Sequence, residues 1–367
     1  MDNEQLTNRN YPDNCQLSSF LSDWESDSPY LEVQTSGSTG TPKRITVRKE
    51  QMVNSARLTC DYLGLRQGDK ALLCMPLRYI AGKMMVVRSL VTGLDLIVRE
   101  PSGHPMADID MPLRFAAMIP LQVYNTLQVP EERERLCQTD ILIIGGGSID
   151  RELEARIQEL PIRAYSTYGM TETLSHIALR RLNGPEASPY YTPFPSVKLS
   201  LSADGTRVID APLVADGTLV TNDVTELLPD GRFRILGRKD NIINSGGIKI
   251  QTETVEEALR SVISANFAIT SVPDPKFGEA MTLLVSAKNN RFPDKETASS
   301  FTGEQSSPLP GDNLFSESGE KIFEILPKYQ RPKHILRVEA IPLTGSGKID
   351  RVACRELAKQ LTRENRQ

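Results

Sequence analysis

Between residues 49 and 159 short apolar runs alternate with stretches of helical periodicity, and this alternation restricts the fold more than any other feature. Lys49 to Leu63 has apolar residues at helical spacing and is followed by Gly64, a residue type common at helix C-caps. Apolar runs at 71–76, 94–98, 115–119 and 141–144 are separated by helical stretches at 80–91, 130–137 and 150–159. Strands alternating with helices predict a layered α/β domain with a largely parallel sheet.

The pattern of expected helices and strands changes twice after this region. From about 190 to 236, strand-like pieces are separated by Asp-Gly pairs at 204–205, 216–217 and 230–231, which predict hairpins in a small antiparallel β subdomain. Past Asp240, a helix at 254–262 and two strands precede a Ser/Pro/Gly-rich stretch at 289–312. Another helix, a strand that contains HILRVEAI and a terminal helix at 352–363 follow it. We therefore expect a large N-terminal α/β domain (1–239) and a smaller α+β C-terminal domain (240–367).

Composition excludes several classes of protein. A net charge of -4 leaves no basic excess for nucleic-acid binding. The five cysteines are scattered without a CxxC pair, which argues against a disulfide framework and a structural zinc site. No apolar run approaches the ~18 residues of a membrane span, and the first residues are too polar for a signal peptide. These features predict a cytoplasmic protein that neither enters a membrane nor binds nucleic acid.

Two glycine-rich stretches raise the question of phosphate binding. QTSGSTGTPKR at 34–44 fails as a P-loop, because Pro42 stands at the second glycine position and Arg44 replaces the Ser/Thr after the lysine. ILIIGGGSID at 141–150 matches a dinucleotide fingerprint poorly, because Asp150 stands where the last glycine should be. Taken locally, these residues indicate an anion-binding loop and no particular chemistry.

Five motifs in order carry a more specific resemblance. They are TSGSTGTPK (35–43), YGMTE (168–172), TND (221–223), GRKD (237–240) and TGSGKIDR (344–351). At these residues the chain resembles the adenylate-forming superfamily of acyl- and aryl-CoA synthetases, luciferases and peptide-synthetase adenylation domains. The resemblance implies that a carboxylate reacts with ATP to give an acyl-adenylate and pyrophosphate, and that a thiol then forms a thioester.

The resemblance also implies roles for residues around ATP. The nucleotide would be held by Thr35, Ser36, Gly37, Ser38, Thr39, Gly40 and Lys43 at the β- and γ-phosphates, by Gly145, Gly146, Gly147 and Tyr168 at adenine, and by Asp223 and Arg238 at the ribose. The catalytic residues would be Lys348, bridging the acyl carboxylate and the α-phosphate, Thr171 at the α-phosphate, and Glu172 holding Mg²⁺.

The second half-reaction implies a mobile C-terminal domain. Asp240 matches the family's hinge, and Ser245, Gly246 and Gly247 would line the tunnel for the thiol of CoA after the domain rotates. The co-substrates and cofactor implied are ATP, CoA and Mg²⁺.

The identity of the acid depends on the segment MPLRYIAGKMMVVRSL (75–90). Tyr79 stands where relatives often have a histidine, which keeps an aromatic lid over the acid. Arg78, Lys83 and Arg88 lie in an otherwise apolar helical stretch. Charged residues on a helix usually form a solvated face, but the segment is similar to that of 2-succinylbenzoate–CoA ligases of menaquinone biosynthesis. There an arginine at the matching place faces a second carboxylate. His176 would line the acyl pocket or be a structural histidine, and both alternatives stay open.

Other readings also remain. They are another aryl- or acyl-CoA ligase, a carrier-protein-loading adenylation domain (less favoured, since no thiolation module follows Gln367), and a non-catalytic acyl-nucleotide binding protein. Only 34 residues precede Thr35, fewer than in most relatives, so either the N-terminal layers are trimmed or another subunit covers that surface as in a homodimer.

Overall fold

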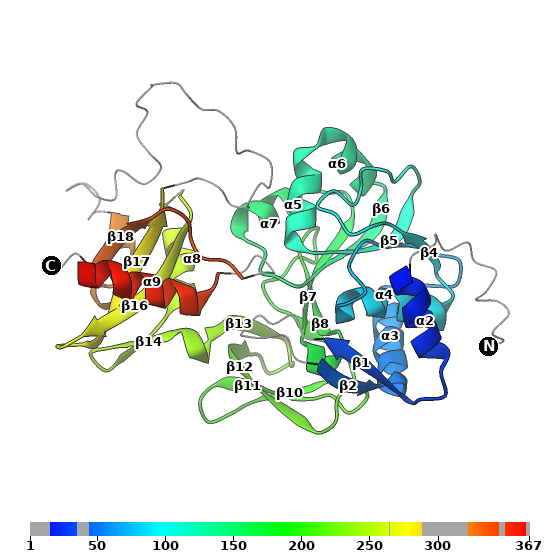
Figure 1. Ribbon diagram of the computed structural model, residues 1–367, viewed down its shortest axis with the longest axis horizontal. Helices are drawn as coiled ribbons and strands as arrows, with labels where there is room; N and C mark the ends of the chain where they lie inside the picture. The colour runs from blue at the N-terminus through cyan, green and yellow to red at the C-terminus, as the bar shows by residue number, and fades with distance from the viewer. Residues whose placement is uncertain (1–14, 35–43, 264, 288–321, 345–348, 365–367) are drawn as a thin grey trace. The chain divides into compact units, whose positions relative to one another are not determined.

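The computed structural model describes residues 15–34, 44–263, 265–287, 322–344 and 349–364 (Figure 1). The chain forms two compact units. Unit 1 contains the residues up to 202 together with 208–221 and 227–234. Unit 2 contains 203–207, 222–226 and the residues from 235 onward. The chain therefore passes between the units several times in the region where the sequence is rich in Asp-Gly pairs.

A seven-stranded sheet in the order β4-β3-β5-β6-β7-β8-β9 forms the centre of unit 1. Its strands are β3 (Lys70–Leu73), β4 (Asp95–Val98), β5 (Leu113–Met118), β6 (Thr139–Ile144), β7 (Arg163–Gly169), β8 (His176–Arg181) and β9 (Thr192–Pro193). Neighbours from β4 to β7 are parallel, whereas β8 is antiparallel to both β7 and β9. The strand order reverses at β3, and ligands of such sheets bind beyond the carboxyl ends of the strands near the reversal.

Helices cover the sheet, which explains why its inner strands are apolar runs rather than alternating patterns. The helices are α3 (Lys49–Leu63), α4 (Ile80–Thr92), α5 (Pro120–Gln128), α6 (Pro130–Leu136) and α7 (Arg151–Gln158). Side chains of α5, α6 and α7, including Val123, Leu136 and Ile157, share one core with Leu72 and Leu142 of the sheet. Helices α3 and α4 pack against each other on the other side in Figure 1.

The amino-terminal part of unit 1 adds helix α2 (Cys15–Glu25) and an antiparallel pair, β1 (Tyr30–Gln34) and β2 (Arg44–Arg48). Gln34 and Arg44, which flank the 35–43 segment, are paired. Gln34 also forms an isolated parallel bridge with Tyr79. The residue before the predicted phosphate loop is thereby paired with the segment after β3.

A four-stranded sheet follows the chain order β10 (Lys198–Leu201), β11 (Thr206–Asp210), β12 (Thr218–Leu227) and β13 (Phe233–Arg238). Gly205, Gly217 and Gly231, the glycines of the three Asp-Gly pairs, have φ between +73° and +85°. Only glycine adopts this region without steric cost, so the pairs mark turns as predicted.

Unit 2 contains a five-stranded sheet with a helix on each face. Its order is β15-β14-β17-β16, with β18 parallel to β17. The elements are β14 (Ile242–Ser245), β15 (Ile248–Gln251), α8 (Thr252–Leu259), β16 (Phe267–Asp274), β17 (Gly278–Ser286), β18 (His334–Val338) and α9 (Arg351–Glu364). Val255 of α8 packs with Leu283 on one face, whereas Cys354 of α9 packs with Leu284 on the other.

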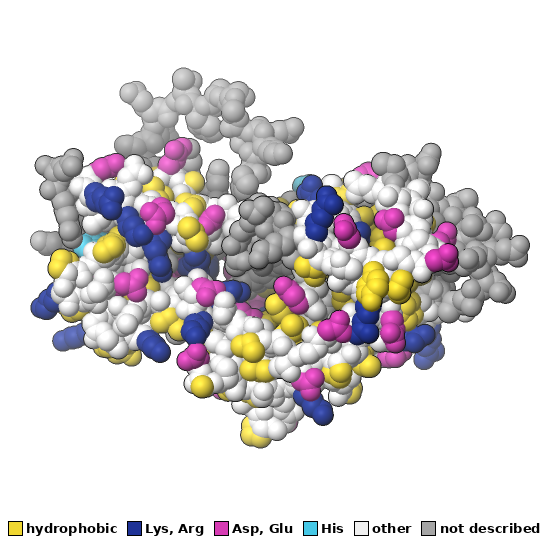
Figure 2. Space-filling model, turned by 60° about the horizontal axis from the view of Figure 1, so that its bottom comes forward, with side chains coloured by type: hydrophobic (Ala, Val, Ile, Leu, Met, Phe, Trp, Pro, Cys, Tyr) yellow, Lys and Arg dark blue, Asp and Glu magenta, His cyan; other side chains and the backbone are white. Residues whose placement is uncertain are grey.

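The predicted mixed α/β fold with several sheets is confirmed, and the differences concern the ends of α8 and one expected helix. Helix α8 begins two residues earlier than predicted and ends three residues earlier. The helix expected before β18 is represented, in the part that the structure describes, by 3-10 turns at 322–325 and 328–330. Of the helices in the described part, none is long and apolar enough to cross a membrane. Acidic and basic side chains are interspersed on the face that Figure 2 shows.

Candidate active site

The three glycines predicted at adenine form a turn at the carboxyl edge of the seven-stranded sheet. Gly145, Gly146 and Gly147 directly follow β6, and the amide of Gly145 donates to the carbonyl of Met118 at the end of β5 (3.0 Å). Gly146 has a φ of +80°. A β-carbon on Gly145 would lie 2.5 Å from Oγ1 of Thr167 in β7. The side chain of Thr167 occupies the space that a β-carbon would need, which explains why glycine stands at Gly145.

Tyr168 lies beside this turn, buried on β7 within an aromatic cluster. Its ring centre is 6.1 Å from that of Tyr191 and 5.4 Å from that of Phe233. Tyr191 and Phe233 stack on each other at 5.4 Å. The motif YGMTE marks Tyr168, whereas Tyr191 and Phe233 were not predicted, because their segments carry no motif and only the fold brings them to β7.

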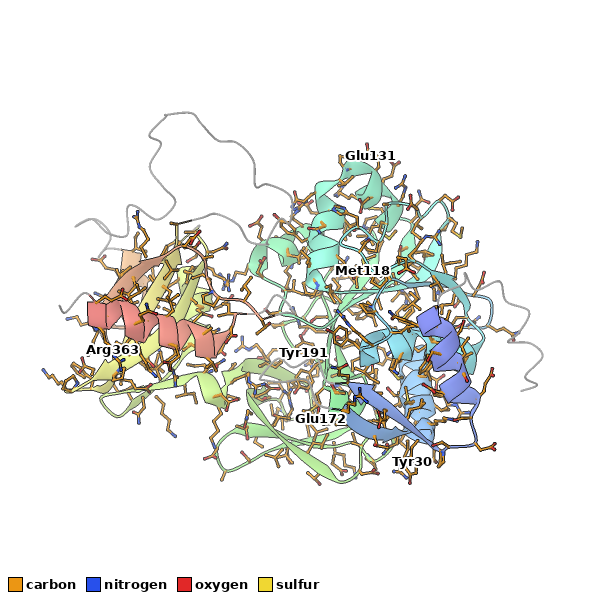
Figure 3. All side chains as sticks on the ribbon, viewed as in Figure 1. Tyr30, Met118, Glu131, Glu172, Tyr191 and Arg363 are labelled. Carbon is orange, nitrogen blue, oxygen red and sulfur yellow. The ribbon has the colours of Figure 1, made fainter. Side chains whose placement is uncertain are left out.

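Glu172 lies in a strained turn between β7 and β8 (Figure 3). The turn contains the 3-10 helix η1 (Thr171–Thr173) and then Leu174, which has φ +65° and ψ -35°. The amide of Ser175 donates to the carbonyl of Thr173 (2.7 Å), which closes a γ-turn around Leu174. This conformation is rare and costs about 1–3 kcal/mol, and such strain concentrates at functional sites.

The carboxylate of Glu172 fits a magnesium ligand. Glu172 is exposed and makes no hydrogen bond or ion pair with any residue that the structure describes. The described residues also contain no group of three or more His, Cys, Asp or Glu able to hold a metal by themselves. Magnesium in nucleotide sites commonly binds through one or two carboxylates together with substrate phosphates. A single free carboxylate at this turn therefore suits a magnesium ion that is held jointly by the protein and the phosphates of a nucleotide.

Arg88 and His176 meet beneath the same turn. Arg88 on α4 is 2% exposed, and its Nη2 donates to Oγ of Ser175 (2.7 Å). His176 is buried at the start of β8, with Nδ1 3.2 Å from the Ser175 hydroxyl and Nε2 3.1 Å from that of Thr59 on α3. Burial lowers the pKa of Arg88 to about 10. Burial, together with Arg88, lowers the pKa of His176 well below 6.5. Thr59 and Ser175 were missed, because a lone hydroxyl carries no sequence signal.

Arg88 has no acidic partner among the described residues. Its Nη1 approaches only Sδ of Met85 (3.6 Å), and its Nε has no hydrogen-bond partner. A buried charge is normally paired, because removing it from water costs several kcal/mol. The arginine therefore has unused donors in an environment that favours an incoming anion.

The residues predicted at the ribose gather in unit 2 with an arginine that the sequence did not reveal. Asp223 accepts from Nη2 of the fully buried Arg207 (3.0 Å), and Nη1 of Arg238 lies 3.6 Å from its other oxygen. Arg238 also donates to Asp240 (2.8 Å), which accepts from Asn222 (3.1 Å). The predicted hinge residue is thus linked through Arg238 to the predicted ribose carboxylate.

Ser245, Gly246 and Gly247 lie at the tip of the β14–β15 hairpin. Ser245 pairs with Ile248, so Gly246 and Gly247 are the two turn residues, with φ of +61° and +81°. Two positive φ values define a type I′ turn, which matches the twist of the flanking strands. The amide of Gly246 donates to the carbonyl of Phe277 (2.8 Å), which fixes the hairpin to the β16–β17 connection.

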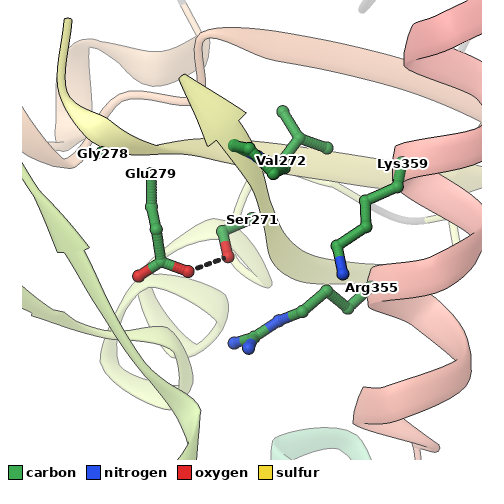
Figure 4. Close-up of a pocket in the computed structure, with 7 residues that line it drawn as sticks. Ser271, Val272, Gly278, Glu279, Arg355 and Lys359 are labelled. Carbon is green, nitrogen blue, oxygen red and sulfur yellow. Dashed lines mark hydrogen bonds between the residues drawn. The ribbon is translucent and has the colours of Figure 1, made fainter. Parts of the chain in front are cut away.

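A polar pocket lies elsewhere in unit 2, between α9 and the sheet (Figure 4). Arg355 and Lys359 of α9 line it together with Ser271 and Glu279, whose side chains are joined by a 2.7 Å hydrogen bond. None of the predicted site residues lines this pocket. The phosphate-loop residues 35–43 and Lys348 lie outside the described residues.

Comparisons with known proteins identify the family. The model of the AMP-binding enzyme family matches residues 4–219. The chain is 24% identical over 352 residues to the 2-succinylbenzoate–CoA ligase of Lactococcus lactis subsp. lactis, covering 90% of this chain and 72% of that protein. Among solved structures, an acyl-CoA synthetase (AMP-forming)/AMP-acid ligase II-like protein from Dyadobacter fermentans is 32% identical with a TM-score of 0.60, covering 92% of both chains.

A further solved structure shares the fold. The O-succinylbenzoate CoA synthetase from Bacillus subtilis, in complex with ATP and magnesium ion, has a TM-score of 0.67 at 20% identity and covers 88% of this chain and 68% of its own. The chain belongs to the AMP-binding enzyme family. It is an adenylate-forming enzyme of the acyl- and aryl-CoA ligase class, so the predictions of the superfamily and of an enzyme are confirmed.

Proposed function

We propose that the enzyme joins an aromatic acid with a second carboxylate, 2-succinylbenzoate, to CoA through an acyl-adenylate, a step of menaquinone biosynthesis. The observation that carries this choice is the buried Arg88 guanidinium, which has no carboxylate partner among the described residues. With a pKa of about 10 it is protonated at neutral pH. A carboxylate at the remote end of the acid would pair with it through charge-assisted hydrogen bonds.

The first half-reaction brings a carboxylate oxygen to an α-phosphate, so both reactants are anions. The roles proposed for the chain are to hold the β- and γ-phosphates with residues 35–43 and to donate to the α-phosphate from Thr171 and Lys348. Glu172 would hold Mg²⁺, which neutralises phosphate charge when bound. The glycines 145–147 and Tyr168 would contact adenine, and Asp223 and Arg238 the ribose hydroxyls.

The second half-reaction requires the thiol of CoA to reach the same carbonyl. We assign residues 1–239 to the AMP-binding domain and 240–367 to a domain that rotates about Asp240 between half-reactions. The type I′ hairpin at Ser245–Gly247 would then line the thiol tunnel. A β-carbon at Gly247 would meet no atom within 4 Å. A large side chain there would cost the strain of its φ of +81° and, under this proposal, would obstruct the thiol tunnel.

The acid assignment is tested by pyrophosphate release with aromatic acids that carry one or two carboxylates, with and without CoA. We expect 2-succinylbenzoate to be preferred and Arg88→Gln to raise its KM by roughly 10–150-fold, which corresponds to the ~1.5–3 kcal/mol of a charged hydrogen bond. The KM for a monocarboxylic acid should change little. Arg57→Gln, at an exposed position on α3, is the matched control. Release only with monocarboxylic acids would overturn the assignment.

The two half-reactions are separated by two further variants. Lys348→Ala should abolish adenylate formation but still convert a pre-made acyl-adenylate into the thioester, whereas Gly247→Trp should do the reverse. Single-turnover assays with ATP, or with the synthetic adenylate plus CoA, measure each step. Equal loss of both steps in Lys348→Ala would contradict the role assigned to this lysine.

A further inference from the structure

A series of hydrogen-bonded side chains, Thr59, His176 and Ser175, connects helix α3 to Arg88. Thr59 is fully buried, and its hydroxyl donates to the carbonyl of Ser55 one turn earlier (3.1 Å). A hydroxyl has one hydrogen, so while Thr59 donates to Ser55 it accepts from Nε2 of His176, 3.1 Å away. In this arrangement the hydrogen of His176 lies on Nε2.

The position of this hydrogen determines which groups donate and which accept in the remaining hydrogen bonds of the series. Burial and the nearby Arg88 keep the pKa of His176 well below 6.5, so the ring is neutral and carries one N–H. With its hydrogen on Nε2, Nδ1 is an acceptor, and the Ser175 hydroxyl donates to it across 3.2 Å. The lone pairs of Ser175 are then directed to Arg88, whose Nη2 donates across 2.7 Å. Each donor in this series has an acceptor of the right kind.

We propose that Thr59 and His176 are positioning residues for substrate selection, because they set the hydroxyl of Ser175 as an acceptor that holds the guanidinium of Arg88. This inference rests on the proposed function, in which Arg88 binds the remote carboxylate of the acid. Ser175 is the strong partner of Arg88 among the described residues, so the guanidinium keeps its orientation only while this hydroxyl accepts. A pre-oriented arginine binds a carboxylate more tightly because less side-chain freedom is lost on binding.

Thr59→Val tests this hydrogen-bond series at the residue farthest from Arg88, and valine keeps the shape of the threonine side chain. Without the Thr59 acceptor, the hydrogen of His176 should move to Nδ1, which then donates to Ser175 and releases its hydroxyl hydrogen to turn toward Arg88. We expect the KM for the dicarboxylic acid to rise roughly 3–10-fold, the range of one neutral hydrogen bond. The KM for ATP, the KM for a monocarboxylic aromatic acid and kcat should stay within about twofold.

A spectroscopic readout separates this role from a structural one. The sequence contains three histidines, so ¹⁵N-histidine labelling resolves each ring, and His176→Gln assigns its signals. The wild type should show the Nε2–H tautomer for His176 at pH 7, Thr59→Val the Nδ1–H tautomer, and Thr59→Ser should restore both the tautomer and the KM. Thr126→Val removes a fully buried hydroxyl that does not belong to this hydrogen-bond series, and it is the matched control.

The outcomes are distinct. A wild-type Nδ1–H tautomer, an unchanged KM in Thr59→Val, or an equal rise for monocarboxylic acids would overturn the inference even when Arg88→Gln weakens binding of the dicarboxylic acid. An Arg88→Gln enzyme with unaltered acid preference would instead refute the proposed function. Should Thr59→Val fail to fold, His176→Gln should likewise raise the KM for the dicarboxylic acid, because it keeps a donor for Thr59 and lacks an acceptor at the Nδ1 position.

Discussion

Gly169, at the end of β7, is the position where one added methyl group should disturb the candidate site most. Gly169 pairs with His176 across the irregular end of the β7–β8 ladder. A β-carbon here would lie 2.1 Å from the carbonyl oxygen of Ser175 and 2.6 Å from Cα of His176. Both are main-chain atoms, so Gly169→Ala cannot be accommodated by a side-chain rotation. The start of β8 must move, and with it the turn that carries Glu172.

The size of the effect follows from these distances. To reach 3.0 Å, the Ser175 carbonyl must move by about 0.9 Å from its present 2.1 Å. A shift of this size at Ser175 would lengthen its 2.7 Å bond with Arg88 to as much as about 3.6 Å, too long for a hydrogen bond. Overpacking costs about 1–3 kcal/mol, and misplacement of a site by about 1 Å can reduce catalysis ~100-fold.

Urea unfolding and acid-dependent ATP–pyrophosphate exchange measure the two effects. We expect Gly169→Ala to lose about 1–3 kcal/mol of stability and roughly 100-fold in exchange rate. Gly103→Ala is the control, because its new β-carbon would meet only the amide end of the Asn125 side chain, which can rotate away at the cost of one 3.2 Å hydrogen bond to the Gly103 carbonyl. If the two variants have the same unfolding midpoint and exchange rate, the close packing of β7 against β8 does not support the site.

Three further predictions concern buried groups. Arg207→Met should destabilise the fold by about 3 kcal/mol in urea unfolding and raise the KM for ATP, because Asp223 would lose its buried partner. Because the folded pKa of His176 lies well below 6.5, stability should fall as pH drops below about 6.5, by up to ~1.4 kcal/mol per pH unit, and His176→Gln should remove this slope in urea titrations. Burial raises the pKa of Cys74 and of Cys354 to about 12, so mass spectrometry should find both unalkylated by iodoacetamide at pH 8 until urea is added.

The fold was predictable because each layer leaves its own periodicity in the sequence. Helix α3 follows from apolar residues at helical spacing and ends at Gly64, which has φ +66° as a C-cap requires. Strand β6 appears as a continuous apolar run because it is covered on both faces. The ends of α8 were less predictable, since its first turn has no capping side chain to mark it.

The candidate site was predictable only where a motif marks it. Tyr168 and Glu172 belong to YGMTE, whereas Tyr191, Phe233 and Arg207 come from stretches that look like ordinary strands. Their contribution depends on strand pairing between distant segments, as when Phe233 and Tyr191 exchange main-chain hydrogen bonds (2.7 and 3.0 Å). A single sequence contains no signal for such pairing, because the same residues would suit many registers.

The three charged residues of the segment 75–90 show what burial adds to a sequence pattern. Arg78 is exposed, Lys83 is half-buried with its ammonium over the ring of Phe20, and Arg88 is 2% exposed. The solvated-face alternative therefore holds for Arg78 and is excluded for Arg88. Because a buried guanidinium without an acidic partner lowers stability, its presence on α4 calls for a compensating function, and in the function proposed above an anionic group on the substrate would supply the missing partner.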